Sequence, residues 1–218
     1  MPPKTKTPEQ RAQTRNSILD AARNLFVARG VEAVTMREIA KQIGCSATAL
    51  YTHFADKETL LQELCSIDFL ALATGMKAIM ALDDPISRLN QLALGYAEFA
   101  LTHPSHYRLM FMTPHIPCEP DERQIAQGNP EQDAYAQLTL MVKLAFNAGC
   151  FREELTESDL IAQTLWAGMH GVCALEIAKR DDAWIEWQPV KTRVALMQEA
   201  LMRGLLKENS KENSKEKN

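Results

Sequence analysis

Residues 35–60 read TMREIAKQIGCSATALYTHFADKETL and carry the start signals of two short helices separated by a glycine turn. Thr35 and Glu38 form a T-x-x-E capping box, in which each side chain accepts from the other residue's backbone N–H at a helix start. Gly44 ends that helix, and Ser46 can cap the next one only two residues later. Two helices joined by so short a turn are typical of a helix-turn-helix, whose second helix lies in the major groove of DNA.

A longer helix is expected before this pair. Thr7 offers an N-cap, Pro8 occupies the first helical position, Gln10 completes a capping box, and Gly30 ends the helix. Its apolar stripe consists of Ile18, Leu19, Ala22, Leu25 and Phe26. Residues 1–55 therefore predict a three-helix DNA-binding domain. From the spacing alone, a three-helix bundle without a DNA role remains an alternative.

The remainder of the chain is also predicted to be helical. Helix signals lie at Asp56 (a long helix toward Leu82), Asp84-Pro85, His103-Pro104, Asn129-Pro130 (ending at Gly149), Thr156 with Asp159 (through Lys179), and Pro189 (to about Leu206). A polar, proline-rich loop is expected at 113–130. We therefore predict an all-α fold of about nine helices, with a helix-turn-helix domain at 1–55, a helical regulatory and dimerisation domain at 56–206, and a disordered polar tail at 207–218.

Composition points to a cytoplasmic protein. The hydrophobic share of 46% suffices for a core, and the five scattered cysteines indicate a reducing compartment. No secretory leader is visible, and the apolar stretch around 64–82 is interrupted by Asp68 and Lys77, so no membrane partner is expected. The net charge of −4 divides into +3 within residues 1–60 and −7 beyond them. A basic N-terminal part suggests that only this part faces a polyanion.

The segment 35–60 resembles the tetracycline-repressor (TetR) family of transcriptional regulators. The shared residues are Thr35, Ile39-Ala40, Gly44, Ser46, Leu50-Tyr51, His53-Phe54, Lys57-Glu58 and Leu60, and the likeness extends back over ILDAARNLFVARG at 18–30. Cys45 stands where a branched aliphatic residue is usual. The later part resembles the Trp-His-Gly subgroup through HPSHYRLMF at 103–111 and LWAGMHGVCALE at 165–176, with Trp166, His170 and Gly171.

The expected reading helix is unusual because residues 44–56 contain no lysine or arginine. Leu50 and Phe54 are expected to face the core, whereas alanine methyls and threonine methyls and hydroxyls on the opposite side can contact base edges without charge. Phosphates would be bound by polar tips and by cations near helix starts. The predicted DNA-binding residues are Thr35, Arg37, Ala47, Thr48, Tyr51, Thr52, His53 and Lys57, and the resemblance implies contact at all of these except Arg37. Lys4, Lys6, Arg11 and Arg15 are candidates for further backbone contacts.

So weakly charged a reader favours a homodimer that presents two helices to a near-palindromic, double-stranded operator. The family pairs its last two helices in a four-helix dimer interface, which implies an interface at Gly168, Gly171, Val194, Met197, Leu201 and Leu205. An apolar stripe packed within one chain is the alternative. The resemblance also implies repression that is relieved by a small effector.

A methionine- and aromatic-rich interior suits a lipophilic or aromatic effector. Its predicted residues are Phe69, Tyr96, Phe99, Met110, Phe111, Met141, Trp166, Met169 and His170. No cofactor or metal is expected, and no nucleotide-binding or catalytic motif is found, so the chain is not predicted to be an enzyme.

Two other classes remain open. His103, His106, His115 and Cys118 lie close enough in sequence to suggest a helical metal- or ligand-binding protein or enzyme without a DNA function. Cys45 or Cys118 could serve a thiol redox sensor, although Cys118 is followed by Glu119, which does not favour a thiolate.

Overall fold

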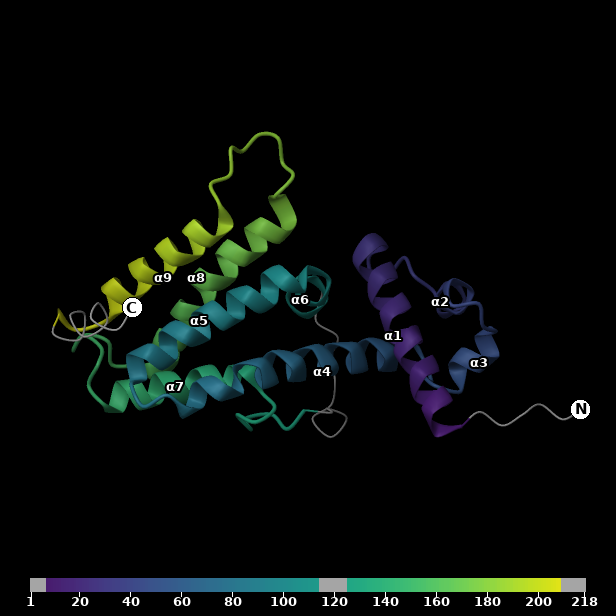
Figure 1. The fold of residues 1–218 in the computed structure, drawn as a ribbon, viewed down its shortest axis with the longest axis horizontal. Helices are drawn as coiled ribbons and strands as arrows, with labels where there is room; N and C mark the ends of the chain where they lie inside the picture. Colours follow the sequence, from purple (N-terminus) through teal and green to yellow (C-terminus); the bar gives the residue numbers. More distant parts are fainter. Residues whose placement is uncertain (1–6, 114–124, 209–218) are drawn as a thin grey trace, which may run out of the picture. The chain divides into compact units, whose positions relative to one another are not determined.

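The structure, a computed structural model, describes residues 7–113 and 125–208, and these residues are predominantly helical (Figure 1). Its helices are α1 (Pro8–Arg29), α2 (Met36–Gln42), α3 (Ala47–Tyr51), α4 (Lys57–Met76), the 3₁₀ helix η1 (Lys77–Ala81), α5 (Pro85–Thr102), α6 (Pro104–Phe111), α7 (Ala134–Asn147), α8 (Ser158–Lys179) and α9 (Val190–Leu205). In the described ranges, the isolated antiparallel bridge between Phe151 and Leu206 is the only β pairing. The predicted all-α fold is confirmed.

The N-terminal helices begin at the predicted caps. Thr7 and Gln10 form a complete capping box at α1, and Thr35 and Glu38 form another at α2. The Thr35 side chain accepts from the Glu38 N–H at 3.3 Å, and Glu38 Oε2 accepts from the Thr35 N–H at 2.9 Å. Both helix starts therefore satisfy backbone donors that have no partner inside the helix.

Three helix boundaries differ from the prediction. The third helix ends at Tyr51 instead of Phe54, and the long fourth helix tightens into 3₁₀ geometry after Met76. α7 begins at Ala134 instead of Pro130, because the Asp133 carboxylate caps it by accepting from the N–H groups of Tyr135 and Ala136. The residues just before Asp133 form turns.

The described chain divides into two compact units. One, here called the head, contains 7–68 and 105–113, and the other, here called the body, contains 69–104 and 125–208. The division falls at residue 68, beyond the boundary expected at 55, and it adds α6 to the head. The reason is visible in the buried cluster of the head, which includes leucines of α4 and α6 beside residues of α1 to α3: Phe26, Ile39, Leu50, Phe54, Leu60, Leu64 and Leu109.

A buried ionic cluster also joins α1, α4 and α6 within the head. Asp68 on α4 is 0% exposed, and its Oδ1 lies 2.7 Å from Arg23 Nη2 of α1. The same oxygen lies 2.8 Å from Nδ1 of His106, which belongs to α6. Arg23 is bonded in addition to the exposed Asp20 at 3.2 Å. The carboxylate of Asp68 therefore links α4 to both α1 and α6.

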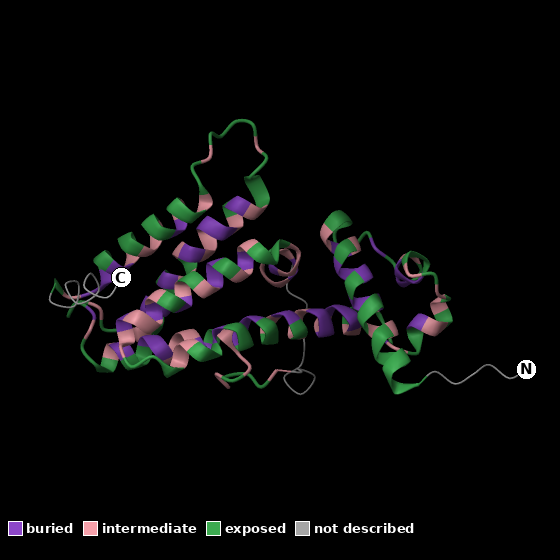
Figure 2. Ribbon diagram, in the orientation of Figure 1, coloured by how far each residue is buried: buried purple, intermediate pink, exposed green. Residues whose placement is uncertain are grey.

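In the body, α8 packs against α5, α7 and α9, and α5 also packs against α7 (Figure 1). Buried and exposed residues alternate along α8 and α9, so that each helix has a covered side and an open side (Figure 2). Residues 57–81 and α8 are long and apolar enough to cross a membrane, a test that core helices of soluble proteins also pass. The expectation that the apolar stretch around 64–82 falls short of a span was therefore wrong by this measure.

Candidate nucleic-acid interface and regulatory site

The turn between α2 and α3 is closed by local backbone geometry. Gly44 has φ +70°, a left-handed conformation that glycine adopts without steric cost. The Cys45 N–H then donates to Ala40 O at 3.0 Å, and Ser46 Oγ accepts from the Ala49 N–H at 3.1 Å. The second helix of the pair therefore starts immediately after the turn, as a helix-turn-helix requires.

One side of α3 is buried and the other is open. Leu50 and Phe54 lie in the core of the head, whereas Tyr51 is 50% exposed. Thr48 and Thr52 are exposed as well, and Ala47 is half-buried. The Thr52 hydroxyl donates to Ala49 O at 2.6 Å. The open side therefore carries a phenol, hydroxyls and methyl groups, the uncharged groups that can read base edges.

The predicted phosphate-binding residues lie in different environments. Thr35 and Arg37 are exposed at the start of α2. Lys57 is half-buried, and its Nζ donates to Val31 O at 3.0 Å. Lys57 must leave this carbonyl to bind a phosphate. His53 is half-buried at the end of the α3 segment.

Arg15, a candidate for a DNA backbone contact, instead bonds to other residues of the head. Its Nη1 donates to His53 O at 2.7 Å, its Nε donates to Glu63 Oε1 at 2.8 Å, and Nη2 also pairs with Glu63. The guanidinium lies 4.2 Å from the centre of the Phe54 ring. Sequence spacing could not reveal the Arg15–Glu63 ion pair, because the two residues are 48 positions apart. Arg11 is exposed, and Lys4 and Lys6 lie outside the described residues.

The predicted effector residues fall into both units. Tyr96, Met141 and Met169 are buried in the body. Phe69, Phe99, Trp166 and His170 are half-buried there, whereas Met110 and Phe111 are half-buried residues of the head.

Three of the body residues meet in a hydrogen-bonded cluster between α5 and α8. The Trp166 indole N–H donates to the Tyr96 hydroxyl at 3.1 Å, and that hydroxyl lies 3.1 Å from His170 Nδ1. Burial lowers the pKa of His170, which favours the neutral imidazole. A neutral Nδ1 can accept from the tyrosine O–H, which leaves the proton on Nε2.

Two further polar residues of the body were missed by the sequence analysis. Tyr135 of α7 lies 5.8 Å from Trp166 between ring centres, and its hydroxyl accepts from the Gln163 amide at 3.3 Å. Gln137 is fully buried and donates to the carbonyls of Ala73 and Pro130, but its Oε1 has no hydrogen-bond partner within the described chain. A buried acceptor without a donor costs about 1–3 kcal/mol.

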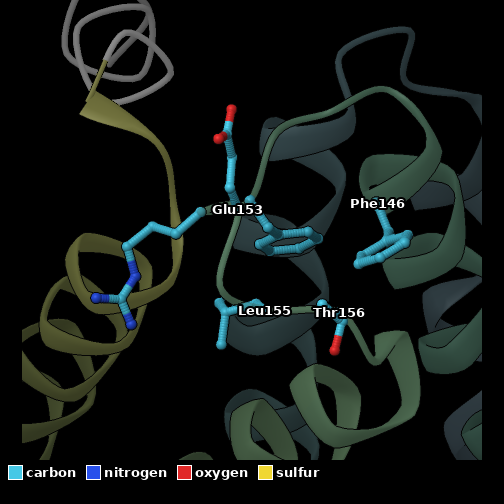
Figure 3. Close-up of a pocket in the computed structure, with 6 residues that line it drawn as sticks. Phe146, Glu153, Leu155 and Thr156 are labelled. Atoms are coloured by element: carbon cyan, nitrogen blue, oxygen red, sulfur yellow. The ribbon is translucent and has the colours of Figure 1, made fainter.

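A surface hollow of about 370 Å³ lies at the connection between α7 and α8 (Figure 3). It is lined by residues from the end of α7 and from the loop that precedes α8: Phe146, Phe151, Arg152, Glu153, Leu155 and Thr156. None of the predicted effector residues lines it.

The residues predicted at a dimer interface lie in or beside the contact between α8 and α9 of one chain. A Cβ added to Gly168 would approach Leu201 Cδ1 to 2.6 Å and Met197 Sδ to 3.3 Å. Val194 and Leu205 are buried, whereas Gly171 is half-buried with open space at its Cβ position. The large apolar side chains left open on these helices are Leu160, Leu175 and Leu196, exposed by 58%, 50% and 65%.

The histidines and cysteines do not gather in the described chain. Among residues 7–113 and 125–208, no three of His, Cys, Asp and Glu are placed to hold a metal ion. His115 and Cys118 lie outside these ranges. Burial raises the pKa of Cys65 and that of Cys173 to about 11, so both remain thiols at neutral pH.

Comparisons with known proteins agree with this architecture. A family sequence model described as bacterial regulatory proteins, tetR family, matches residues 18–64, and one described as tetracyclin repressor-like, C-terminal domain, matches residues 89–200. The chain is 32% identical over 171 residues to the HTH-type transcriptional regulator AcrR of Shigella flexneri, covering 76% of this chain and 77% of that protein. It is 33% identical over 99 residues to the HTH-type transcriptional repressor KstR2 of Mycolicibacterium smegmatis, covering 44% and 47% of the two chains.

Solved structures share the fold. A TetR family transcription regulator from Marinobacter aquaeolei VT8 superposes with a TM-score of 0.71 at 16% identity, covering 92% of this chain and 99% of that one. The ketosteroid transcriptional regulator KstR2 of Mycobacterium tuberculosis gives a TM-score of 0.61 at 21% identity, with 89% and 96% covered.

A capped helix pair with an open second helix, carried in a helical head, defines a DNA-binding protein of the helix-turn-helix class. The chain belongs to the TetR family and is a DNA-binding transcriptional regulator. The matched relatives are transcription regulators, which decides against the class of helical protein without a DNA function. The narrower likeness to the Trp-His-Gly subgroup stays a prediction.

Proposed function

We propose that the protein is a cytoplasmic repressor that binds a near-palindromic operator as a homodimer and is released by a small apolar effector. The observation that carries the DNA-reading part is the open side of α3, where Tyr51, Thr48 and Thr52 are exposed while Leu50 and Phe54 hold the helix in the core. Arg37 and Lys57 supply cations for the phosphates. A relative that is named as a repressor supports repression over activation.

Operator binding is tested by mobility shift on DNA from upstream of the protein's own gene, followed by random-site selection if no shift is seen. The test compares the unchanged chain with a Tyr51→Ala/Lys57→Ala variant and with Lys191→Ala, an exposed lysine of α9 in the body. Specific binding should be lost in the first variant and kept in the second. Equal loss in both variants, or no selected site, would contradict the proposal.

The open sides of α8 and α9 support the dimer. Leu160, Leu175 and Leu196 expose apolar surface on two neighbouring helices, and Gly171 leaves room for close approach of another helix. Large exposed apolar patches are typical of interaction sites, and these leucines supply apolar surface for one. The proposed face differs from the predicted one, because Met197 and Leu201 of α9 lie against Gly168 of α8 within one chain. Sedimentation of the purified chain against a Leu175→Glu/Leu196→Glu variant tests it.

The interior of the body supports an apolar effector that carries a hydrogen-bond donor. Gln137 and Met141 lie one turn apart on α7 and both are buried. The unmatched Gln137 Oε1 would accept from a hydroxyl or amide of the effector, and the neighbouring methionines and aromatic rings would bind its apolar frame. One structural relative is named as a ketosteroid transcriptional regulator, which agrees with a lipophilic class of compound.

Effectors are found by screening apolar hydroxylated compounds for release of the operator, with quenching of tryptophan fluorescence as a second readout. Gln137→Met should abolish the response to an effector while operator binding is kept. Release that persists unchanged in Gln137→Met would place the effector elsewhere. By linkage, the effector must bind the state that does not bind DNA more tightly, by the same factor by which it weakens operator affinity.

A further inference from the structure

The loop between α8 and α9, residues 180–189, displays one tryptophan to solvent. Trp184 is 97% exposed, and Ile185 beside it is exposed by 44%. The Trp184 N–H donates to Asp182 Oδ1 at 3.1 Å, and the Ile185 N–H donates to Asp182 O at 3.2 Å. Tryptophan is the residue type most enriched at the energetic centres of protein interfaces, so an indole presented in this way indicates a partner.

Other contacts hold this loop in place. The Trp187 indole N–H donates to Lys179 O at 2.9 Å, and the Arg193 guanidinium lies 4.6 Å from the centre of that ring. Arg193 also pairs with Glu176 of α8 and donates to Gln188 O at 2.9 Å. The two ends of the loop are therefore fastened, and Trp184 is displayed in an ordered loop, which reduces the entropy lost on binding.

The hollow of Figure 3 lies at the opposite end of the α8–α9 pair. Its apolar wall consists of Phe146, Phe151 and Leu155, and Thr156 lies beside them. The backbone N–H of Arg152 donates to Leu205 O at 3.0 Å, which ties the hollow to the end of α9. The Arg152 guanidinium has no ion pair with any described residue, whereas Glu153 pairs with Lys207 at 3.3 Å.

We propose that Trp184 of one chain inserts into this hollow of a second copy, so that each protomer both gives and receives an indole. The inference rests on the homodimer proposed above. A two-fold interface is isologous, which means that if residue i contacts residue j of the partner, then j also contacts i. Trp184 lies at one end of α8 and the hollow lies at the other end. When the two α8 helices lie antiparallel across the two-fold axis, each Trp184 therefore meets the hollow of the other chain.

The exposed leucines give the register of this arrangement. Leu160 near the start of α8 would meet Leu175 of the second copy, and Leu175 would meet Leu160. The same antiparallel arrangement brings the loop after α8 of one chain to the end of the second α8 that adjoins the hollow. The 22 residues of α8 span about 33 Å, so the two insertions would lie at the two ends of a long contact.

Charge complementarity supports the same pairing. Asp181 and Glu186 flank Trp184 and are exposed. Asp181 lies 3.9 Å from Arg180, and Asp182 is paired with Lys179 at 3.4 Å. Arg152 at the hollow can lie over the indole face and can also pair with these carboxylates. A cation over an indole contributes about 0.5–2 kcal/mol. The loop 180–189 carries three carboxylates and one arginine, and it is therefore matched to Arg152, which has no ion pair with a described residue.

The inference is tested by sedimentation of four samples: the unchanged chain, Trp184→Ala, Arg152→Glu, and an equimolar mixture of the two variants. Each variant alone should dimerise at least about tenfold more weakly, because both insertions are impaired. The mixed dimer keeps one intact insertion, since the Arg152→Glu chain supplies the indole and the Trp184→Ala chain supplies the hollow. The mixture should therefore dimerise more tightly than either variant alone.

Accessibility of the indole gives an independent readout. Acrylamide quenching is compared between the unchanged chain and Trp184→Phe, at concentrations below and above the dimer transition. The quenching due to Trp184 should fall on dimerisation. A dimer of unchanged affinity in Trp184→Ala, a mixture no tighter than its components, or an indole quenched equally in both states would overturn the insertion and leave the dimer standing. An unchanged chain that stays monomeric would overturn both.

Discussion

The ammonium group of Lys57 can bond either to the Val31 carbonyl or to a DNA phosphate, but not to both. In the head it donates to Val31 O at 3.0 Å, a charge-assisted bond that holds the start of α4 against the end of α1. On DNA the same group would bind a phosphate and release a counterion. Binding therefore exchanges one charge-assisted bond for another, and the gain comes mainly from the released counterion.

At His170 the structure predicts a pH dependence. Burial lowers the pKa of the imidazole below its ordinary value of 6.5, so the unfolded chain binds more protons than the folded one as the pH falls below 6.5. The contribution of this group to stability is therefore complete above pH 6.5 and is lost on acidification through the lowered pKa.

Titration of the His170 ring protons by NMR should give a midpoint below 6.5. Urea unfolding at pH 7.5 and 5.5 should show a smaller loss of stability on acidification in His170→Gln than in the unchanged chain. A midpoint at or above 6.5 would contradict the burial argument.

At the scale of elements, α6 belongs with the DNA-binding head. Leu109 lies in the core of the head, and His106 shares the Asp68 carboxylate with Arg23 of α1. From position along the chain alone, α6 is expected in the regulatory domain. Packing assigns it differently, since apolar burial does not depend on separation in sequence.

Removal of the shared carboxylate should be costly. Asp68→Ala leaves Arg23 buried without its main partner, and breaking a buried pair in this way costs about 3–5 kcal/mol. Asp20→Ala removes the exposed partner of the same arginine and should cost about 0–1 kcal/mol. Urea unfolding of both variants makes the comparison. Similar losses in the two variants would show that the buried cluster contributes little.

The two interior glycines of α8 should respond differently to alanine. Within one chain Gly171→Ala meets open space, so the monomer should gain up to about 1 kcal/mol from helix propensity. Gly168→Ala brings a methyl group to 2.6 Å from Leu201 Cδ1, so overpacking of about 1–3 kcal/mol opposes that gain. Thermal unfolding at a protein concentration below the dimer transition should therefore rank Gly168→Ala below Gly171→Ala. The reverse order would mean that Leu201 moves aside freely.

Charge is distributed unevenly over the whole molecule, with +3 in residues 1–60 and −7 in the remainder. An acidic remainder disfavours non-specific contact with DNA, because that contact is mostly phosphate electrostatics. The few cations near the reading helix then decide affinity. In a dimer each of them acts twice.

Salt dependence measures this directly. Each phosphate contact contributes about 0.9 to the slope of log affinity against log salt, so Arg37→Ala and Lys57→Ala should each lower the slope by about 1.8 in a dimer. Lys191→Ala, on α9 in the body, should leave it unchanged. A decrease of about half that size would indicate one head per site.

The local elements could be predicted from the sequence in some detail. Capping boxes, Gly44 and the apolar spacing predicted α1, α2 and the start of α3, because each signal acts within a few residues. Boundaries set by competition between several possible caps, such as the start of α7 at Asp133, were missed. The open side of α3 followed from helical periodicity.

The helical class, the helix-turn-helix and the family depend on short-range patterns, so they could be recognised from the order of the residues alone. Which partner each side chain uses became clear only from the packed fold. Arg15 bonds Glu63, α6 joins the head, and the stripe of α9 packs on Gly168 of its own chain. These contacts join residues far apart in sequence, and many alternative pairings satisfy the same pattern. Close packing selects among them, because side chains must fill the interior at high density.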